Sequence, residues 1–217
     1  MRPRSVTEKI LLSLAALGVA GAIAGLGTFA TFTSTTSASH TATAGKVAIA
    51  LGASGAANRL SVSATDVVPG DTINRAVDLI STSSSAIKTV KLTTTATVSS
   101  VLDTNTTDGL QMYIRSCSLP AGWTEAGSSP AYTYTCPSGT ISDVLGSAAS
   151  PVNIITTTSG GVSLANLTAT TTAGPVTDHL VITVILPQAN TSANLATPPS
   201  STIQYSFTGT QRDGTNR

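Results

Sequence analysis

The sequence predicts an all-β protein: a single jelly-roll-like β-sandwich with one short inserted helix, preceded by an N-terminal signal helix. Three observations lead to this fold class. Apolar and polar residues alternate with period two in many short runs, the runs are rich in Thr and Val, and turns containing Gly or Pro separate them. Only 10% of the residues are charged, which excludes a coiled coil, because coiled coils need abundant Glu, Lys and Arg.

The first 30 residues have the layout of a secretory signal peptide. Arg2, Arg4 and Lys9 precede an uncharged run from Ile10 to Ala30 that is rich in Leu, Ala, Val and Gly. A retained transmembrane helix is the alternative, since about 20 apolar residues can span a bilayer. Four glycines weaken the helix, however, and no cluster of stop-transfer charges follows. We therefore interpret residues 1–30 as a signal peptide.

Small residues mark the cleavage site. Thr28 and Ala30 occupy the −3 and −1 positions of a site between Ala30 and Thr31. Cleavage after Ala38 is the second option. Removal of residues 1–30 takes away three basic groups and one acidic group and leaves the mature chain nearly neutral. Neither form has the basic cluster that a nucleic-acid-binding protein needs, so no nucleic acid is expected as a partner.

Nine runs after the signal peptide are predicted strands. They are Lys46–Leu51, Arg59–Thr65, Ile73–Ile80, Ala86–Val98, Leu110–Cys117, Ala131–Cys136, Val152–Thr156, Leu180–Leu186 and Thr202–Thr208. Val68-Pro69-Gly70-Asp71 predicts a tight turn, because Pro sets the first central φ and Gly tolerates the second. The continuous apolar run within residues 180–186 is typical of a strand that is central in its sheet or buried on both faces.

One stretch departs from the strand pattern. Thr140-Ile141-Ser142-Asp143 has the spacing of an acidic capping box, and apolar residues follow it. This pattern predicts a short helix over residues 141–148, inserted between strands. No repeat of fixed period and no Pro-rich linker divides the mature chain, so we expect one folded domain over residues 46–211 and a short tail over 212–217.

Cys117 and Cys136 are the only cysteines of the chain. An even number of cysteines in an exported protein favours a disulfide. The alternative, a metal-binding or redox pair, lacks both the C-x-x-C spacing and helper ligands. The bond would close a loop that contains Trp123, and the chain-entropy model assigns such a loop roughly 3 kcal/mol of stabilisation.

Few residues could carry enzyme chemistry. The two histidines, His40 and His179, are distant in sequence and form no H-E-x-x-H motif. His179 follows Asp178 at a strand entry, where we expect a solvated turn. No G-x-S-x-G motif occurs, and a serine triad would have to use one of these two histidines. The sequence therefore predicts no enzyme, no cofactor, no catalytic residue and no metal site.

Three blocks of sequence resemble the TasA/camelysin family. The first comprises Gly27–Ser34 followed by Ala42–Leu51, which resembles the end of the family's signal peptide and its first strand. The second is Pro69-Gly70-Asp71 with Ser83–Lys88, although Ser replaces the family's Asn and Gly there. The third, Ser201–Gln211, resembles the family's closing strand. The middle of the chain is unmatched, but the blocks occur in the family's order.

The resemblance implies a secreted jelly-roll protein of the extracellular matrix or cell surface, assembled into biofilm fibres. Its implied partners are other copies of itself in a head-to-tail homopolymer, a dedicated signal peptidase, and an accessory matrix or anchoring protein. In such fibres the freed N-terminal segment of one subunit adds as a strand to the next. The metallo-endopeptidase activity of camelysin is the alternative function. A carbohydrate-binding jelly roll, using Trp123, Tyr132 and Tyr134, is another.

The segment over residues 31–45 has the composition of a donor strand. Its first residues, Thr31, Phe32, Thr33, Ser34, Thr35 and Thr36, are uncharged and lack Pro and Gly. They have β propensity but too little apolar bulk to fold alone, so they suit pairing with an open sheet edge. A disordered mature N-terminus is the alternative interpretation of the same composition.

Overall fold

The computed structural model describes residues 46–61, 67–189 and 199–214 of the chain. These residues belong to one compact unit. None of their helices is long and apolar enough to cross a membrane. The predicted signal peptide, its cleavage site at Ala30 and Thr31, and the donor residues 31–36 lie outside the described residues, as does His40.

The larger sheet contains six antiparallel strands in the order β1-β2-β10-β4-β7, with β8 paired to the other end of β4. Its strands are β1 (Ile49–Leu51), β2 (Thr72–Ser81), β4 (Gln111–Cys117), β7 (Ile141–Leu145), β8 (Val152–Asn153) and β10 (Val176–Ile185). Because β2 and β10 pair over ten residues without a register shift, they form the framework of this sheet.

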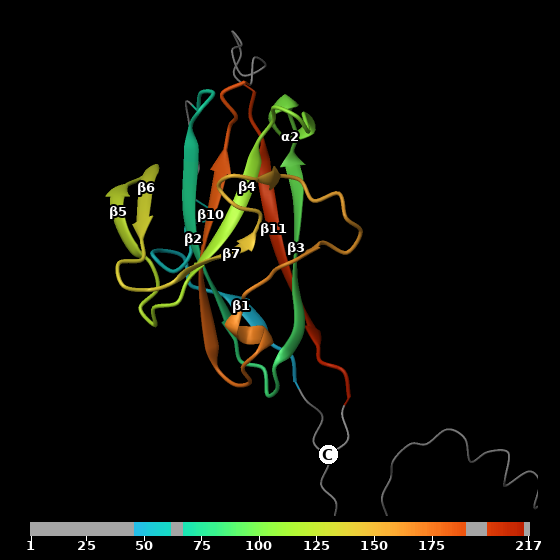
Figure 1. Cartoon of the computed structure of the whole chain (residues 1–217). Coiled ribbons are helices and arrows are strands. Elements are labelled where there is room, and N and C mark those ends of the chain that lie inside the picture. Colours follow the sequence, from blue (N-terminus) through green and yellow to red (C-terminus); the bar gives the residue numbers. More distant parts are fainter. Residues whose placement is uncertain (1–45, 62–66, 190–198, 215–217) are drawn as a thin grey trace, which may run out of the picture. The chain divides into compact units, whose positions relative to one another are not determined.

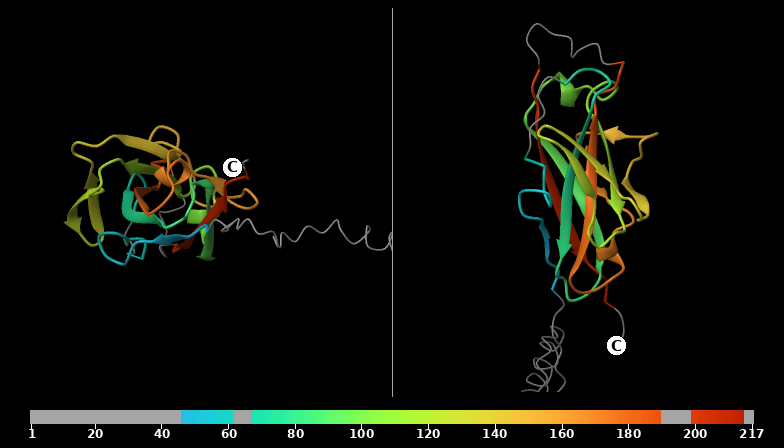
Figure 2. Two further views of the ribbon diagram at one scale, coloured as in Figure 1. Left: turned by 90° about the horizontal axis from the view of Figure 1, so that it is seen from below. Right: turned by 90° about the vertical axis from the view of Figure 1, so that its left-hand side faces the viewer.

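The smaller sheet has three strands in the order β11-β3-β9. They are β3 (Ile87–Val98), β9 (Val162–Ser163) and β11 (Thr202–Gln211). The chain passes from one sheet to the other between β2 and β3, and again between β3 and β4 (Figure 1). The two sheets pack face to face in Figure 2 and enclose a core of aliphatic side chains, among them Leu79, Leu92, Ile114, Leu180 and Ile182. The predicted β-sandwich is confirmed.

Strand β10 is the central strand of the larger sheet. It pairs with β2 on one side and with β4 on the other, and Leu180–Val184 are all buried. The apolar run in the sequence therefore reports burial on both faces, as predicted. The predicted turn at Val68–Asp71 is also present, since Asp71 N–H donates to Val68 O at 3.0 Å and Gly70 has a φ of +98°.

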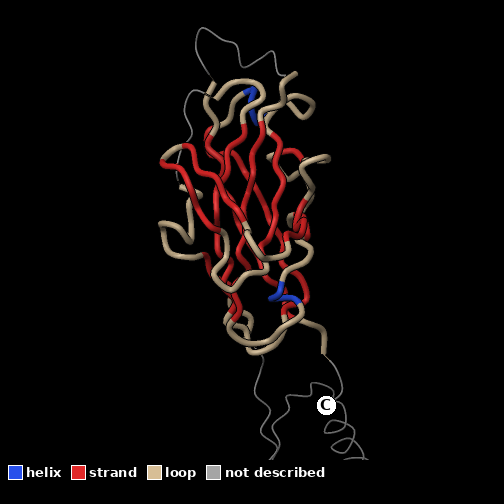
Figure 3. The backbone as a smooth tube through the Cα atoms, turned by 60° about the vertical axis from the view of Figure 1, so that its left-hand side comes forward, coloured by secondary structure: helices blue, strands red, loops and turns tan. Residues whose placement is uncertain are grey.

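The predicted helix over residues 141–148 is wrong, because Ile141–Leu145 form strand β7. Within β7 the side chains alternate between exposed and covered positions, and Val144 is buried in the core. The α-helix among the described residues is instead α2 (Val101–Thr104), one short turn that a complete capping box between Ser100 and Asp103 begins. Figure 3 shows α2 and the 3₁₀ helix η1 (Thr168–Thr170) at opposite ends of the sandwich.

Other strand boundaries differ from the prediction. The predicted strand Arg59–Thr65 is not found in the described residues: residues 60 and 61 lie in a turn, and residues 62–66 are outside the described ranges. Three strands were not predicted: β7, where a helix was expected, β9, and β5 (Thr124–Ser128). The sequence of β5 is T-E-A-G-S, which has few β-forming residues, so its strand conformation depends on pairing with β6 (Ala131–Thr135).

Strands β5 and β6 form a separate two-stranded hairpin beside β2 (Figure 1). The hairpin belongs to the long connection between β4 and β7. Ser129 and Pro130 form its turn, and Cys136 follows its second strand. This connection is called the hairpin excursion below and comprises residues 118–140.

Candidate assembly site

The edge of the smaller sheet is open along β11. This strand pairs with β3 on one side along its length, and no described strand pairs with its other side. An edge strand of this kind presents a row of backbone N–H and C=O groups that another strand can bind. The inward side chains of β11, including Ile203, Tyr205 and Phe207, are half-buried, whereas its outward side chains are exposed Thr, Ser and Gln.

The N-terminal part of the described chain lies beside this edge. In Figure 2 the blue segment over residues 46–61 runs along the sandwich next to the red strand β11. The two are close at Gly209, where an added Cβ would lie 3.3 Å from Val47 Cγ1 and 3.5 Å from Ile49 Cγ2. Yet β1 is paired with β2, in the other sheet. The two sheets therefore approach each other here without backbone pairing across the gap.

Next to this contact, residues 51–61 and strand β11 line a groove of about 400 Å³. One wall consists of Leu51, Ser54, Asn58, Leu60 and Ser61, and Ile203 and Tyr205 form the other wall. None of these side chains is charged. Burial raises the pKa of the Tyr205 hydroxyl to about 12, and this hydroxyl is uncharged near neutral pH, as an ordinary tyrosine is. The groove is thus neutral, largely apolar, and bordered by the open edge of β11.

The first wall, residues 51–61, extends the edge of β2. Gly52 N–H donates to Asp78 O at 2.8 Å, Asp78 N–H donates to Ala57 O at 2.8 Å, and Arg59 N–H donates to Ala76 O at 2.9 Å. A side chain at Gly52 would place a Cβ 2.7 Å from Ala57 O, so only glycine allows this close approach. The wall is thus hydrogen-bonded to β2 and forms part of the edge of the larger sheet.

The side chain of Arg59 fastens this wall to the hairpin excursion. Its Nε and Nη2 donate to the two carboxylate oxygens of Glu125 at 3.0 and 2.6 Å, and its guanidinium lies 4.7 Å from the centre of the Tyr132 ring. Tyr134 donates its hydroxyl to Glu125 at 3.0 Å. The hydrogen bonds from Arg59 lower the pKa of Glu125, and burial raises that of Tyr134 to about 12. Arg59 and Glu125 are therefore both charged at neutral pH and form an ion pair.

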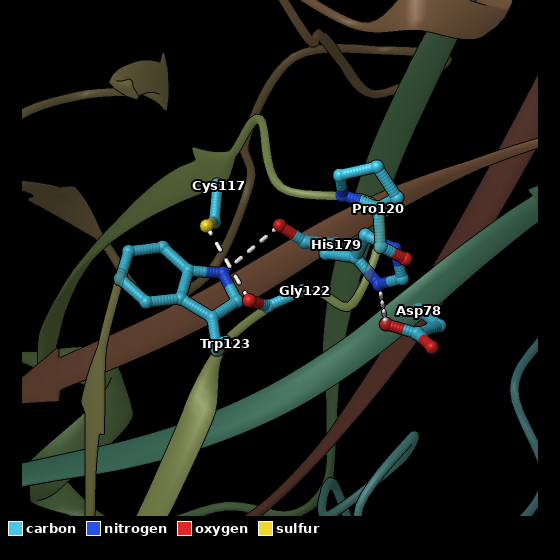
Figure 4. Close-up of polar contacts among 6 residues, drawn as sticks. All are labelled: Asp78, Cys117, Pro120, Gly122, Trp123 and His179. Atoms are coloured by element: carbon cyan, nitrogen blue, oxygen red, sulfur yellow. Dashed lines mark hydrogen bonds and ion pairs between the residues drawn. The ribbon is translucent and has the colours of Figure 1, made fainter. Parts of the chain in front are cut away.

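The predicted disulfide between Cys117 and Cys136 is present in the structure. It joins the end of β4 to the residue after β6 and closes the base of the hairpin excursion. Trp123 lies inside this loop and donates its indole N–H to His179 O at 2.9 Å (Figure 4). Trp123, Tyr132 and Tyr134 are each half-buried, and the Arg59 guanidinium lies over the Tyr132 ring, so the three do not form a fully exposed aromatic platform of the kind that binds sugars.

His179 does not lie in a solvated turn as expected. It belongs to β10, opposite Asp78 of β2, and only 14% of its side chain is exposed. Its Nδ1 lies 2.7 Å from Asp78 Oδ1 and its Nε2 lies 3.1 Å from Pro120 O, as Figure 4 shows. Asp78 belongs to β2, and Pro120 belongs to the hairpin excursion. His179 therefore ties the excursion to β2.

The described residues do not fit a metal site. No three side chains of His, Cys, Asp or Glu converge within residues 46–61, 67–189 and 199–214. Both nitrogens of His179 already have protein partners, and both cysteines are in the disulfide. A catalytic zinc needs three protein ligands and an open position, which this set of side chains does not provide.

The sequence does not indicate the groove or the two side-chain pairs that connect the wall and β2 to the hairpin excursion. Arg59 and Glu125 are 66 residues apart, and Asp78 and His179 are 101 residues apart. No local pattern indicates pairs at such separations. One signal was present, since Arg and Glu are scarce in this chain and each stands within a polar or small-residue stretch.

Among the described residues, the free edge of β11 lies beside a neutral, largely apolar groove, an arrangement that can bind an extended segment by strand addition. The chain belongs to the camelysin metallo-endopeptidase family, whose model matches residues 5–120. The resemblance seen in the sequence is therefore confirmed. The match includes the wall over residues 51–61 but not β11. No curated protein matches the chain.

Proposed function

We propose that the processed chain is a structural subunit of extracellular matrix fibres. Its N-terminal segment, residues 31–45, adds as a strand to the next copy and occupies the groove between β11 and the wall over residues 51–61. The observation that carries this proposal is the open edge of β11 beside an apolar groove of about 400 Å³. Secretion through the signal peptide of residues 1–30 precedes assembly.

The donor segment and the groove are chemically complementary. Residues 31–36 are uncharged, and Phe32 is the one large apolar side chain of residues 31–45. Leu51, Leu60 and Ile203 offer it an apolar seat, while β11 offers backbone hydrogen bonds. Backbone pairing supplies affinity and a side-chain pocket supplies register in complexes of this kind.

Assembly of this kind produces filaments. The donor segment of one copy and the groove of the next are different surfaces, so the contact is heterologous and leaves a free donor and a free groove at opposite ends. Retention of the signal peptide blocks assembly, because the donor segment is released only by cleavage. A peptidase that cleaves between Ala30 and Thr31 therefore controls when fibres form.

Electron microscopy of the processed chain tests the proposal. We expect fibres from the wild type and none from the Thr33→Pro/Thr35→Pro variant, because each proline removes a backbone donor from the strand. Thr33→Val/Thr35→Val is the matched control, since it keeps both N–H groups and has high β propensity, and it should assemble. Fibres from the proline variant as abundant as those of the wild type would refute strand donation by this segment.

The family description favours a second candidate, a metal-dependent peptidase. The described residues provide no ligand set for it. Zinc analysis of the purified protein, with casein cleavage before and after EDTA, tests this candidate directly. Stoichiometric zinc together with EDTA-sensitive cleavage would establish a peptidase.

A further inference from the structure

We propose that the disulfide-anchored hairpin β5–β6 holds the assembly groove in shape, and that Glu125 is the positioning residue, acting through Arg59. The inference rests on the proposed function, because it assigns a role in assembly to a part of the fold outside the groove. Neither Glu125 nor the disulfide lines the groove. Their effect on it passes through the wall over residues 51–61.

Arg59 lies near the C-terminal end of this wall. It directly precedes Leu60 and Ser61, which both line the groove. Its backbone N–H binds Ala76 O on β2, and its side chain binds Glu125 on β5 with two hydrogen bonds. A planar guanidinium that binds both carboxylate oxygens is fixed in direction as well as in distance. The hairpin therefore helps to fix the positions of Leu60 and Ser61 in the groove.

The hairpin that carries Glu125 is held at three points. Glu125 stands opposite Tyr134 in the β5–β6 ladder and accepts a hydrogen bond from the hydroxyl of that tyrosine. At the hairpin turn, Pro130 O accepts a hydrogen bond from Arg75 Nη1 at 3.1 Å. At the base, the disulfide fixes Cys136, the residue after β6, to the end of β4. A continuous series of contacts thus runs from the disulfide to Leu60.

Asp78 provides a second tie between the same two regions. Its backbone binds Gly52 and Ala57 in the wall, and its carboxylate binds His179 Nδ1. His179 Nε2 in turn faces Pro120 O, at the start of the excursion. The wall is therefore attached to the excursion at both of its ends. These two ties add to the direct backbone hydrogen bonds between the wall and β2.

The test compares Glu125→Gln with Asp213→Asn in the processed chain. Asp213 forms an ion pair of the same 2.6 Å length with Lys88, but this pair is exposed and lies outside the groove, so it is a matched control. Fibre elongation is followed by light scattering, folding by circular dichroism, and the wall by hydrogen exchange of residues 52–61 in unassembled protein. We expect Glu125→Gln to slow elongation about tenfold and to speed exchange in the wall. Asp213→Asn should change neither.

Elongation and wall exchange at wild-type rates in Glu125→Gln would overturn the proposal. If that variant loses its fold, Tyr134→Phe replaces it. This substitution removes the hydroxyl that bonds to Glu125 and to the Ala76 backbone, and keeps both carboxylate oxygens for Arg59. Unchanged exchange in the wall would then overturn the proposal. A chain lacking residues 31–36 separates the two hypotheses. If it still forms fibres, strand donation fails, whereas the exchange experiment on unassembled protein continues to test the role of Glu125.

Discussion

Strands β10 and β11 are both ten residues long but have opposite places in the fold. Strand β10 pairs on both sides and is covered on both faces, whereas β11 pairs on one side and alternates half-buried and exposed side chains. The sequences differ accordingly, from V-T-D-H-L-V-I-T-V-I to T-I-Q-Y-S-F-T-G-T-Q. Strand β10 therefore contributes most to the stability of the fold, whereas β11 leaves backbone groups available for a partner.

The largest effect should come from β10. Leu180 is fully buried in the core, so Leu180→Ala should reduce the free energy of unfolding by about 2–5 kcal/mol through lost burial and a residual cavity. Ile203→Ala on β11, where the side chain is only half-buried, should cost less than half as much. Urea denaturation of the two variants measures this difference. Equal losses would show that β11 is as integral to the core as β10.

The disulfide should have the next largest effect. Replacement of both Cys117 and Cys136 by Ser should lower the free energy of unfolding by about 2–4 kcal/mol, because the unfolded chain gains the freedom of a closed loop. Mass spectrometry of the secreted wild type before and after reduction first establishes the bond through a shift of two hydrogens. Free thiols in freshly secreted, non-reduced protein would contradict the prediction.

The strands of the sandwich were largely predictable from the sequence, because alternation and apolar runs record burial directly. The run over residues 180–186 even indicated the central position of its strand. Capping was less informative. The same spacing occurs at Thr140–Asp143 and at Ser100–Asp103, but only the second begins a helix. At the first, pairing with β4 and burial of Val144 override the local preference.

The groove and its supports could not be predicted, because they arise from contacts between distant segments. Leu60 and Ile203 appear in the sequence as ordinary apolar strand residues. Their common position in the groove depends on the approach of the two sheets at Gly209. The same limit applies to His179, which the sequence placed in a solvated turn and the fold places between β2 and β4.

A smaller effect should come from the entry to β11. Asp103 accepts hydrogen bonds from Ser201 Oγ, Ser100 N–H and Ser99 Oγ, and so it attaches the start of β11 to helix α2. Burial opposes ionisation of Asp103, but these hydrogen bonds outweigh it and lower its pKa. Asp103→Asn should therefore cost about 1.5–3 kcal/mol at neutral pH, since one amide oxygen cannot replace two charged ones.

The pH dependence gives the sign of this contribution. A carboxyl group whose pKa is lower in the folded state stabilises the fold fully above its unfolded pKa of about 3.9, and the contribution disappears as the pH falls through the folded value. Urea midpoints between pH 6 and pH 2.5 should decline more steeply in the wild type than in Asp103→Asn. The pKa of Glu125 is lowered too, so part of the decline should persist in the variant. Parallel curves would exclude a role for Asp103 in acid sensitivity.

The smallest effect on stability should accompany a large effect on assembly. Leu51 is 36% exposed at the mouth of the groove, so Leu51→Lys should change the free energy of unfolding by no more than about 0.5 kcal/mol. The same substitution places a charge in a neutral apolar seat, where a donor strand would have to desolvate it, so fibres should not form. Ile141→Lys is the matched control, since Ile141 is 45% exposed on β7, at the opposite edge of the larger sheet. If Ile141→Lys blocks assembly and Leu51→Lys does not, the donor strand binds beside β7, and the open edge of β11 serves another purpose.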